Sequence, residues 1–261
     1  MKTIGVIPAR WKASRFEGKI LAEINGKPMI QHVWERAKEA KVLDDLIIAT
    51  DSEQVISIVK GFGGKVVYTS KDQPSGSDRI AEVVNPIDVE IIVNIQGDEP
   101  LIHHSMIDSL ATALLEDKSI PMATLVKRIE KKEDFFNPNV VKVVIDKDGN
   151  ALYFSRSPVP YLRSLEPAQH SVLDVASWFS HHSYDPESVR YYKHIGIYAY
   201  TKDFLFTYTN LPKSMLENSE KLEQLRALEN GYKIRTIETQ YDTIGVDTLE
   251  DLKKVEEALR K

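Results

Sequence analysis

Basic residues are concentrated in one short stretch near the start of the sequence. The four cations there are Arg10, Lys12, Arg15 and Lys19. Small residues separate them, and Glu17 is the one acid between the first and the last. Arginine, lysine and the backbone N–H groups of a helix N-terminus hold phosphate oxygens and neutralise their charge. The stretch therefore predicts a polyphosphate site, with a solvated basic loop as the alternative, although neither Walker A nor G-x-G-x-x-G is present.

Two aspartates, Asp98 and Asp247, follow apolar segments that we expect to be strands. Mg²⁺ prefers one or two carboxylates together with phosphate oxygens and water. Two carboxylates and a cationic loop are what phosphoryl or nucleotidyl transfer requires, since catalysis there is mainly positioning and charge stabilisation. Gly97 would let the backbone approach a ligand closely. The alternative for each aspartate is a helix cap, a common place for Asp.

Several other chemistries are excluded or disfavoured by the sequence. It contains no cysteine, so disulfides, thiolate nucleophiles and cysteine-bound zinc are excluded. It also lacks the H-E-x-x-H and G-x-S-x-G motifs. The net charge of −5 argues against a nucleic-acid binder. No apolar run approaches the roughly 20 residues that span a bilayer, and the first apolar segment is too short for a signal peptide. We therefore expect a cytoplasmic protein that binds no membrane.

The elements that must position these residues alternate between strand and helix in the first half. Strands are predicted at residues 4–7, 46–50, 65–69 and 90–95, the first ended by Pro8, and helices at about 28–41, 53–60, 75–84 and 103–116. This alternation favours a parallel sheet with right-handed crossovers. Ligands of such sheets bind outside the carboxyl ends of the strands. The loops after Ile7, Thr50, Thr69 and Ile95 should therefore share one cleft.

The second half of the sequence departs from this alternation. Short strands are predicted at residues 122–126, 140–145, 151–154, 194–200 and 233–237, with a hairpin turn at 146–150. A polar helix is expected at about 216–230, and Thr248 is expected to cap a final helix. Residues 158–189 are polar and are predicted to form a long loop. The 261 residues suit one α/β domain or one domain with an insertion.

A series of motifs follows one order along essentially the whole chain. They are Ile7-Pro8-Ala9-Arg10 with Arg15 and Gly18-Lys19, Ser75-Gly-Ser-Asp-Arg79, Asn94-Ile-Gln-Gly-Asp-Glu-Pro100, Asn137-Pro-Asn-Val-Val-Lys142, Tyr153-Phe-Ser-Arg156, His194-Ile-Gly-Ile-Tyr198, Leu222-Glu-Gln-Leu-Arg226 and Gly245-Val-Asp-Thr248. Together they resemble the 3-deoxy-manno-octulosonate (Kdo) cytidylyltransferase family. The resemblance implies an α/β nucleotidyltransferase fold of the glycosyltransferase A type. Its mostly parallel central sheet would be flanked by helices, with a smaller mixed-strand subdomain.

The resemblance also implies a reaction and its participants. In line attack by the anomeric hydroxyl of Kdo on the α-phosphate of CTP would give CMP-Kdo and pyrophosphate, with Mg²⁺, for lipopolysaccharide synthesis. The protein would be a homodimer. Residues 1–261 would form one nucleotidyltransferase domain, with a sugar-binding and dimerisation subregion at about 120–215.

Site residues are implied by the same resemblance. The triphosphate would be held by Arg10, Arg15 and Lys19, and the cytidine would be surrounded by Pro8, Ala9, Ser75, Gly76 and Arg79. Gln96 would lie near the ribose and the sugar. Asp98 and Asp247 would hold Mg²⁺ and act in catalysis with Lys19 and Arg10. The sugar pocket would be lined by Arg156, His194, Tyr198, Glu223 and Gln224. His194 and Tyr198 lie four apart on a predicted strand, so they share one face, whereas Ile195 and Ile197 face the core.

Two departures from the family pattern leave alternatives open. Glu17 stands where family members usually have proline, which places an acid in the phosphate loop. The loop at 158–189 looks longer than usual and adjoins the sugar pocket, so an 8-amino analogue of Kdo is an alternative substrate. A nucleotide-sugar binding protein without turnover is the other alternative. The pair of Asp98 and Asp247 favours the enzyme, because a pure binder would not need both carboxylates.

Overall fold

The chain folds into two compact units. The structure is a computed structural model that describes residues 1–11, 18–161 and 190–260. The first unit comprises Met1–Thr124, Gly196–Leu211 and Tyr241–Lys261, and the second comprises Leu125–Ile195 and Pro212–Gln240. Within the described residues, no helix has both the length and the apolar character needed to cross a bilayer.

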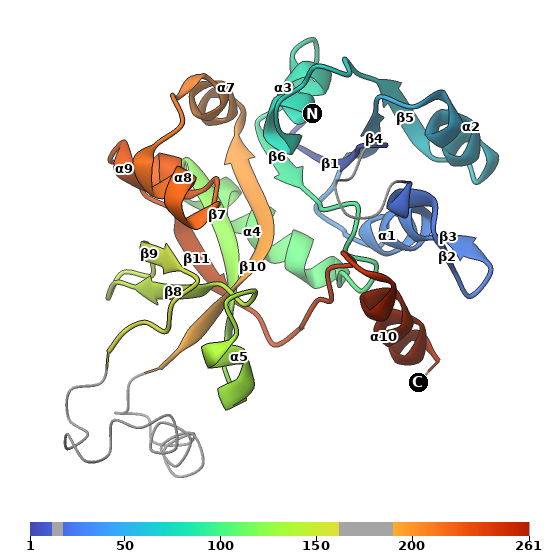
Figure 1. Cartoon of the computed structure of the whole chain (residues 1–261). Helices are drawn as coiled ribbons and strands as arrows, with labels where there is room; N and C mark the ends of the chain where they lie inside the picture. Colours follow the sequence, from blue (N-terminus) through green and yellow to red (C-terminus); the bar gives the residue numbers. More distant parts are fainter. Residues whose placement is uncertain (12–17, 162–189, 261) are drawn as a thin grey trace. The chain divides into compact units, whose positions relative to one another are not determined.

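A mostly parallel sheet forms the centre of the first unit (Figure 1). Its parallel strands, in spatial order, are β6 (Ile91–Asn94), β1 (Thr3–Ala9), β4 (Asp45–Thr50) and β5 (Lys65–Tyr68). The last residues of β10 (Tyr192–Thr201) run antiparallel along β6. Apart from Pro8 and Leu46, which are half-buried, the apolar side chains of β1, β4 and β6 are buried, as expected for strands covered on both faces. The predicted parallel sheet is thus confirmed.

The helices of the first unit differ in what they pack against. They are α1 (Met29–Ala37), α2 (Glu53–Gly61), α3 (Gly76–Val84), α4 (His104–Glu116), α7 (Lys202–Asn210) and α10 (Leu249–Leu259). A short turn of 3₁₀ helix, Lys19–Leu21, and the hairpin of β2 (Glu23–Ile24) with β3 (Lys27–Pro28) precede α1. The first four helices of this unit pack against the sheet and begin near the predicted residues, whereas α7 packs against α3 and α10 packs against β2. The side-chain oxygens of Ser52 and Ser75 accept backbone N–H groups at the starts of α2 and α3. The sequence pattern did not predict α7.

Strand β1 is longer than the sequence predicted, because Pro8 does not end it. Pro8 is in register with Ala49 of β4, and the strand continues to Ala9. The ladder between β1 and β6 ends earlier, at Val6 and Asn94. Pro8 therefore lies where β1 is paired on one side only, the kind of position where a residue without an N–H is tolerated.

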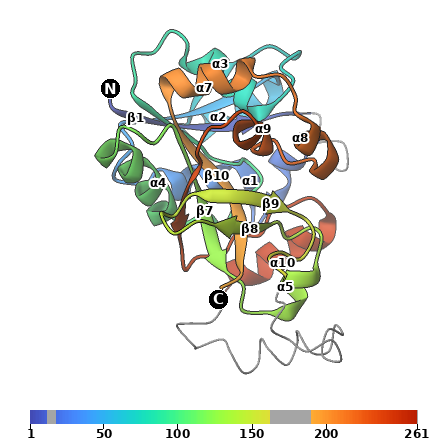
Figure 2. The same cartoon turned by 90° about the vertical axis from the view of Figure 1, so that its left-hand side faces the viewer.

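Short strands and helices form the second unit (Figure 2). Its hairpin of β8 (Lys142–Ile145) and β9 (Ala151–Ser155) is antiparallel, and Gly149 has the positive φ of 81° that its turn requires. The predicted hairpin is thereby confirmed. Within this unit β7 (Met122–Arg128) lies between β10 and β11 (Arg235–Glu238). The short helix α5 (Lys132–Phe136) was not predicted.

The single helix predicted at about 216–230 is wrong. Two short helices occupy this segment, α8 (Met215–Glu220) and α9 (Leu225–Glu229). Lys221, between them, has φ of 55°, a left-handed conformation that a continuous helix cannot contain. The two helices are joined by a buried ion pair, in which the guanidinium of Arg226 donates to Glu217 at 2.8 and 2.6 Å. The leucine spacing did not reveal this break.

Candidate active site

The basic stretch begins where β1 ends, and its two ends are brought together. The backbone N–H of Gly18 donates to the carbonyl of Trp11 at 3.2 Å. Gly18 has φ of 69°, and a Cβ there would lie 3.3 Å from the Trp11 ring. Glycine suits this position because its backbone is left-handed and close to an aromatic ring. Residues 12–17, which include Arg15 and Glu17, lie outside the described residues, so their predicted roles stay predictions.

The ammonium of Lys19 lies between the two aspartates that the sequence singled out. Its Nζ donates to Asp98 Oδ2 at 2.6 Å, to Asp247 Oδ1 at 2.9 Å and to the carbonyl of Val246 at 3.0 Å. Burial disfavours the charge on Lys19, but the two carboxylates outweigh this effect and raise its pKa. The predicted phosphate-binding lysine and the predicted metal ligands therefore form one cluster in the first unit.

Asp247 reaches this cluster from a loop. The expectation that it follows a strand is wrong, since β11 ends at Glu238 and no strand is assigned among the residues from 239 to α10. The loop is held in place because the backbone N–H of Val246 donates to the carbonyl of Asp98 at 2.9 Å. The helix-cap alternative is also wrong for both aspartates. Thr248 caps α10 in a capping box with Asp251, and His103 caps α4.

The carboxyl group of Glu99, beside Asp98, was not singled out by the sequence. Burial, with a further contribution from the charge of Asp98, raises its pKa to about 8. Its Oε2 is buried and has no hydrogen-bond partner among the described residues. Burial therefore favours the neutral form of the Glu99 carboxyl group.

The wall predicted to surround the cytidine is formed where β1 meets the start of α3. A Cβ on Gly76 would lie 3.5 Å from the Pro8 ring, so these two residues are neighbours. Gly97 approaches from β6, where a Cβ would lie only 3.0 Å from the carbonyl oxygen of Pro8. A larger residue at 97 would push these strand ends apart. Gln96, one residue earlier, donates to Asn94 Oδ1 at 3.3 Å.

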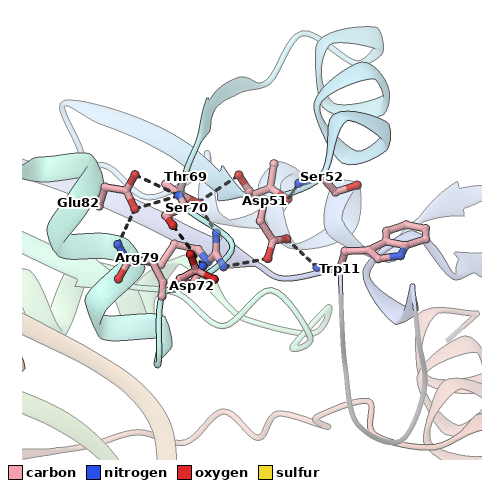
Figure 3. A network of polar contacts seen from close by, with 10 residues as sticks. Trp11, Asp51, Ser52, Thr69, Ser70, Asp72, Arg79 and Glu82 are labelled. Atoms are coloured by element: carbon pink, nitrogen blue, oxygen red, sulfur yellow. Dashed lines mark hydrogen bonds and ion pairs between the residues drawn. The ribbon is translucent and has the colours of Figure 1, made fainter.

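Arg79 lies behind this wall, and its side chain is fully buried. Its guanidinium donates to Asp51 Oδ2 at 3.0 Å and to the hydroxyl of Thr69 (Figure 3). Asp51 and Thr69 follow β4 and β5, so the loops after those strands meet as predicted. A cavity of about 750 Å³ opens beside them, within the usual size of ligand pockets; its lining includes Arg10, Trp11, Asp51, Tyr68, Gln73 and Arg79.

In the second unit, Arg156 is organised by a residue that the sequence did not reveal. The backbone N–H of Arg156 donates to Glu220 Oε2 at 2.9 Å, and its Nε donates to the carbonyl of Glu220 at 2.8 Å. Nη1 donates to the carbonyl of Pro138 at 3.0 Å. Burial opposes the charge on Glu220, but hydrogen bonds from Arg156, Ser155 and Tyr153 lower its pKa overall. No spacing in the sequence pairs positions 156 and 220.

The remaining residues of the predicted sugar pocket differ in their surroundings. Gln224 is 3% exposed, and its Nε2 has no hydrogen-bond partner among the described residues. Glu223, beside it, is half-buried. His194 packs edge-on against Phe154, and burial lowers its pKa to about 3, so it is neutral at physiological pH. Burial alternates along β10 as predicted, with Ile195 and Ile197 buried and Tyr198 half-buried.

The donor set of the cluster suits a hard cation completed by phosphate. Among the described residues, no group of three or more His, Cys, Asp or Glu side chains could hold a metal ion. Asp98 and Asp247 nevertheless converge on one cation, the ammonium of Lys19. One or two carboxylates plus substrate oxygens is the usual set for Mg²⁺.

The relationship that the motifs predicted is confirmed by comparison with known proteins. The sequence profile of the cytidylyltransferase family matches residues 4–234. The 3-deoxy-manno-octulosonate cytidylyltransferase of Geobacter sulfurreducens is 48% identical over 260 residues, with 100% of both chains covered. Its counterpart from Pelobacter propionicus is 50% identical over 260 residues, covering 100% of this chain and 98% of its own.

Solved structures agree with this relationship. The structure of CMP:2-keto-3-deoxy-manno-octonic acid synthetase complexed with CTP is 41% identical, with a TM-score of 0.87 over 100% of this chain and 99% of that chain. A 4-diphosphocytidyl-2C-methyl-D-erythritol synthase from Anaerococcus prevotii is 14% identical, covers 100% of this chain and 99% of its own, and shares the fold alone, with a TM-score of 0.61. The predicted nucleotidyltransferase fold is thereby confirmed. The chain belongs to the cytidylyltransferase family, among the 3-deoxy-manno-octulosonate cytidylyltransferases.

Proposed function

We propose that this protein joins CTP and Kdo to give CMP-Kdo and pyrophosphate. The observation that carries the proposal is the cluster of Lys19, Asp98 and Asp247 at the carboxyl ends of the parallel strands. A cation and two carboxylates beside a basic loop suit a triphosphate with its metal. The names of the relatives, which are about half identical over the full length, support CTP and Kdo as the substrates.

The reaction we propose is one displacement at the α-phosphorus of CTP. The anomeric oxygen of Kdo forms a bond to phosphorus, the bond to the pyrophosphate oxygen breaks, and the proton of the anomeric hydroxyl leaves to solvent. Lys19 and Arg10 would neutralise charge on the phosphates as it shifts toward the leaving group. Asp98 and Asp247 would hold Mg²⁺, which supplies further charge neutralisation when it is bound. Pro8, Ala9, Ser75 and Gly76 would orient the cytidine.

We expect Kdo to bind to the residues that the family resemblance implies for the sugar pocket. Kdo carries a carboxylate and several hydroxyl groups, so its pocket needs both donors and acceptors. The Nε2 of Gln224 is a buried donor with no hydrogen-bond partner in the part of the chain that the structure describes, and an oxygen of the sugar would accept its hydrogen bond. His194 is neutral, so it would contribute a hydrogen bond and no charge. Arg156, Glu223, Tyr198 and Gln96 complete the proposed set.

A substrate panel tests this proposal. CTP, UTP and ATP are each combined with Kdo or its 8-amino analogue in the presence of Mg²⁺, and pyrophosphate release is measured. We expect turnover with CTP and Kdo, abolished by EDTA and restored by added Mg²⁺. Turnover with the 8-amino analogue and not with Kdo would show that the analogue is the sugar substrate. Nucleotide binding without pyrophosphate release would indicate a binding protein and refute the enzyme.

We also propose that the protein acts as a homodimer in the cytoplasm. The expectation rests on the family, in which dimers are common, and on CTP as a cytoplasmic nucleotide. Mass measured by light scattering across a range of concentrations would test the oligomeric state. A single species of 29.7 kDa at every concentration would refute the dimer.

A further inference from the structure

We propose that Asp51 is a positioning residue. Its carboxylate would fix the basic loop after β1, at Trp11, relative to the start of α3, which would surround the cytidine. The inference rests on the proposed function, which places CTP in this cleft. Asp51 follows the last residue of β4, and its side chain is 13% exposed. It would touch neither the reacting atoms nor the metal. Its effect on CTP would pass through the two segments that its carboxylate joins.

Each oxygen of the Asp51 carboxylate is bonded to a different segment (Figure 3). Oδ1 accepts the backbone N–H of Trp11 at 3.1 Å, and Oδ2 accepts from Arg79 Nη2 at 3.0 Å. Trp11 belongs to the basic loop after β1 and is the last described residue before position 12, whereas Arg79 belongs to α3. One side chain therefore connects the loop after β1 with the helix after β5.

The bond between Asp51 and Trp11 is linked to the catalytic cluster through Gly18 and Lys19. The carbonyl of Trp11 accepts the N–H of Gly18 at 3.2 Å, which joins the two ends of the loop. The next residue is Lys19, whose ammonium bonds to Asp98 at 2.6 Å. The Trp11 backbone is thus held from both sides, by Asp51 through its N–H and by Gly18 through its carbonyl.

On the wall side, the contact fixes the first turns of α3. Arg79 is fully buried and also donates to the Thr69 hydroxyl. A buried charge needs a paired charge, and Asp51 is the carboxylate bonded to this guanidinium. The helix starts at Gly76, in contact range of the Pro8 ring. Holding Arg79 therefore holds the segment that would surround the base.

The bond to Trp11 distinguishes positioning from a purely structural role. Neutralising Arg79 requires one carboxylate near the guanidinium, but it does not require a second bond to a loop amide. Asparagine breaks one of these two bonds, because its side chain has one acceptor oxygen, its NH₂ group cannot accept a hydrogen bond, and the two donors reach different oxygens of Asp51. Asp51→Asn can therefore hold either Trp11 or Arg79, and not both.

Asp45 provides a matched control at the opposite end of the same strand. Its Oδ1 accepts the N–H of Leu46 at 2.9 Å, and its Oδ2 accepts from Lys65 Nζ at 2.6 Å. Asp45→Asn therefore makes the same chemical change to a carboxylate with the same type of bonding, one backbone N–H and one cation. It lies at the amino end of β4, away from the proposed nucleotide site.

The experiment measures the Kd for CTP without sugar, both KM values, kcat and Tm for the wild type and the two variants. We expect Asp51→Asn to raise the Kd and KM for CTP about tenfold, the size expected when a charge-assisted hydrogen bond is lost. The KM for Kdo should change less than about twofold, and Asp45→Asn should keep wild-type CTP affinity. A structural role alone would lower Tm without separating the two KM values.

The inference is overturned if Asp51→Asn binds CTP as the wild type does, or if Asp45→Asn weakens CTP binding equally. Should Asp51→Asn fail to fold, Asp51→Glu decides the matter, since it keeps the charge beside Arg79 but displaces it by one methylene. Wild-type Tm with weakened CTP binding would support the inference, and wild-type CTP binding would overturn it. A wild-type protein that binds no CTP would refute the proposed function itself.

Discussion

Replacing Asp98 with asparagine separates the electrostatic role of this residue from its structural role. Asparagine keeps the shape and one acceptor for Lys19, and it removes the negative charge from the cluster. Removing one electrostatic stabiliser from an active site typically lowers kcat by about 10²–10³-fold, or about 2.7–4 kcal/mol. We therefore expect kcat for pyrophosphate release to fall at least about 100-fold.

The free energy of unfolding of this variant should differ little from that of the wild type. The Asp98 side chain is 32% exposed, and Lys19 keeps its bonds to Asp247 and to the Val246 carbonyl. Loss of a partly exposed ion pair costs up to about 1 kcal/mol. For a chain of this length, that corresponds to a Tm decrease of about 2–4 °C.

Pyrophosphate release at saturating CTP and Kdo measures the first quantity, and differential scanning calorimetry measures the second. Asp44→Asn is the control, because the carboxylate of Asp44 accepts the backbone N–H groups of Lys2 and Thr3, away from the cluster. It should keep wild-type kcat. Near-normal turnover of Asp98→Asn would refute the metal assignment, and a Tm decrease above about 10 °C would indicate a structural role instead.

Three further predictions concern the loop, the sugar pocket and pH. Arg15→Ala should raise the KM for CTP about tenfold with little change for Kdo, because a guanidinium holds phosphate oxygens through paired hydrogen bonds; steady-state kinetics would contradict this if only the KM for Kdo rose. Gln224→Ala should raise the KM for Kdo about tenfold and leave that for CTP within about twofold, and titration with Kdo beside a non-hydrolysable CTP analogue checks it. His194 has a pKa lowered to about 3. The unfolded chain therefore binds a proton that the folded chain does not between about pH 6.5 and 3, so stability should fall with decreasing pH by up to about 1.4 kcal/mol per unit. Urea unfolding at pH 7, 6 and 5 measures this slope, and His194→Gln should reduce it; an equal slope in both proteins would refute the assignment.

The sequence predicted the parallel sheet well because its strands are short, apolar and followed by polar loops. The same signal located Asp98, whose position after β6 is the expected one for a ligand-binding residue. Asp51 carries this signal too, after β4, but the sequence does not reveal its partners. A hydrogen bond between positions 51 and 79 depends on tertiary packing, which periodicity cannot report.

The second unit was predicted less well, for physical reasons that two residues illustrate. Lys221 interrupts a segment with good helical spacing, because its backbone is left-handed, with a φ of 55°. Glu220 organises Arg156 through contacts 64 positions apart, and no local pattern marks it. Asp247 lies near Asp98, through their shared contact with Lys19, but it follows a loop and not the strand that the sequence predicted. Its place depends on the bond between Val246 and Asp98.

The discontinuity of the first unit has a consequence for biosynthesis. Its three segments include Tyr241–Lys261, and the contact between Lys19 and Asp247 spans 228 positions of sequence. A ribosome therefore adds 228 residues after Lys19 before the second carboxylate is complete. Nascent chains would hold an incomplete cluster with one carboxylate, and a premature stop before position 247 would leave Lys19 without one of its counter-charges. Because distant pairings form late and slowly, completion of the cluster should be among the last steps of folding.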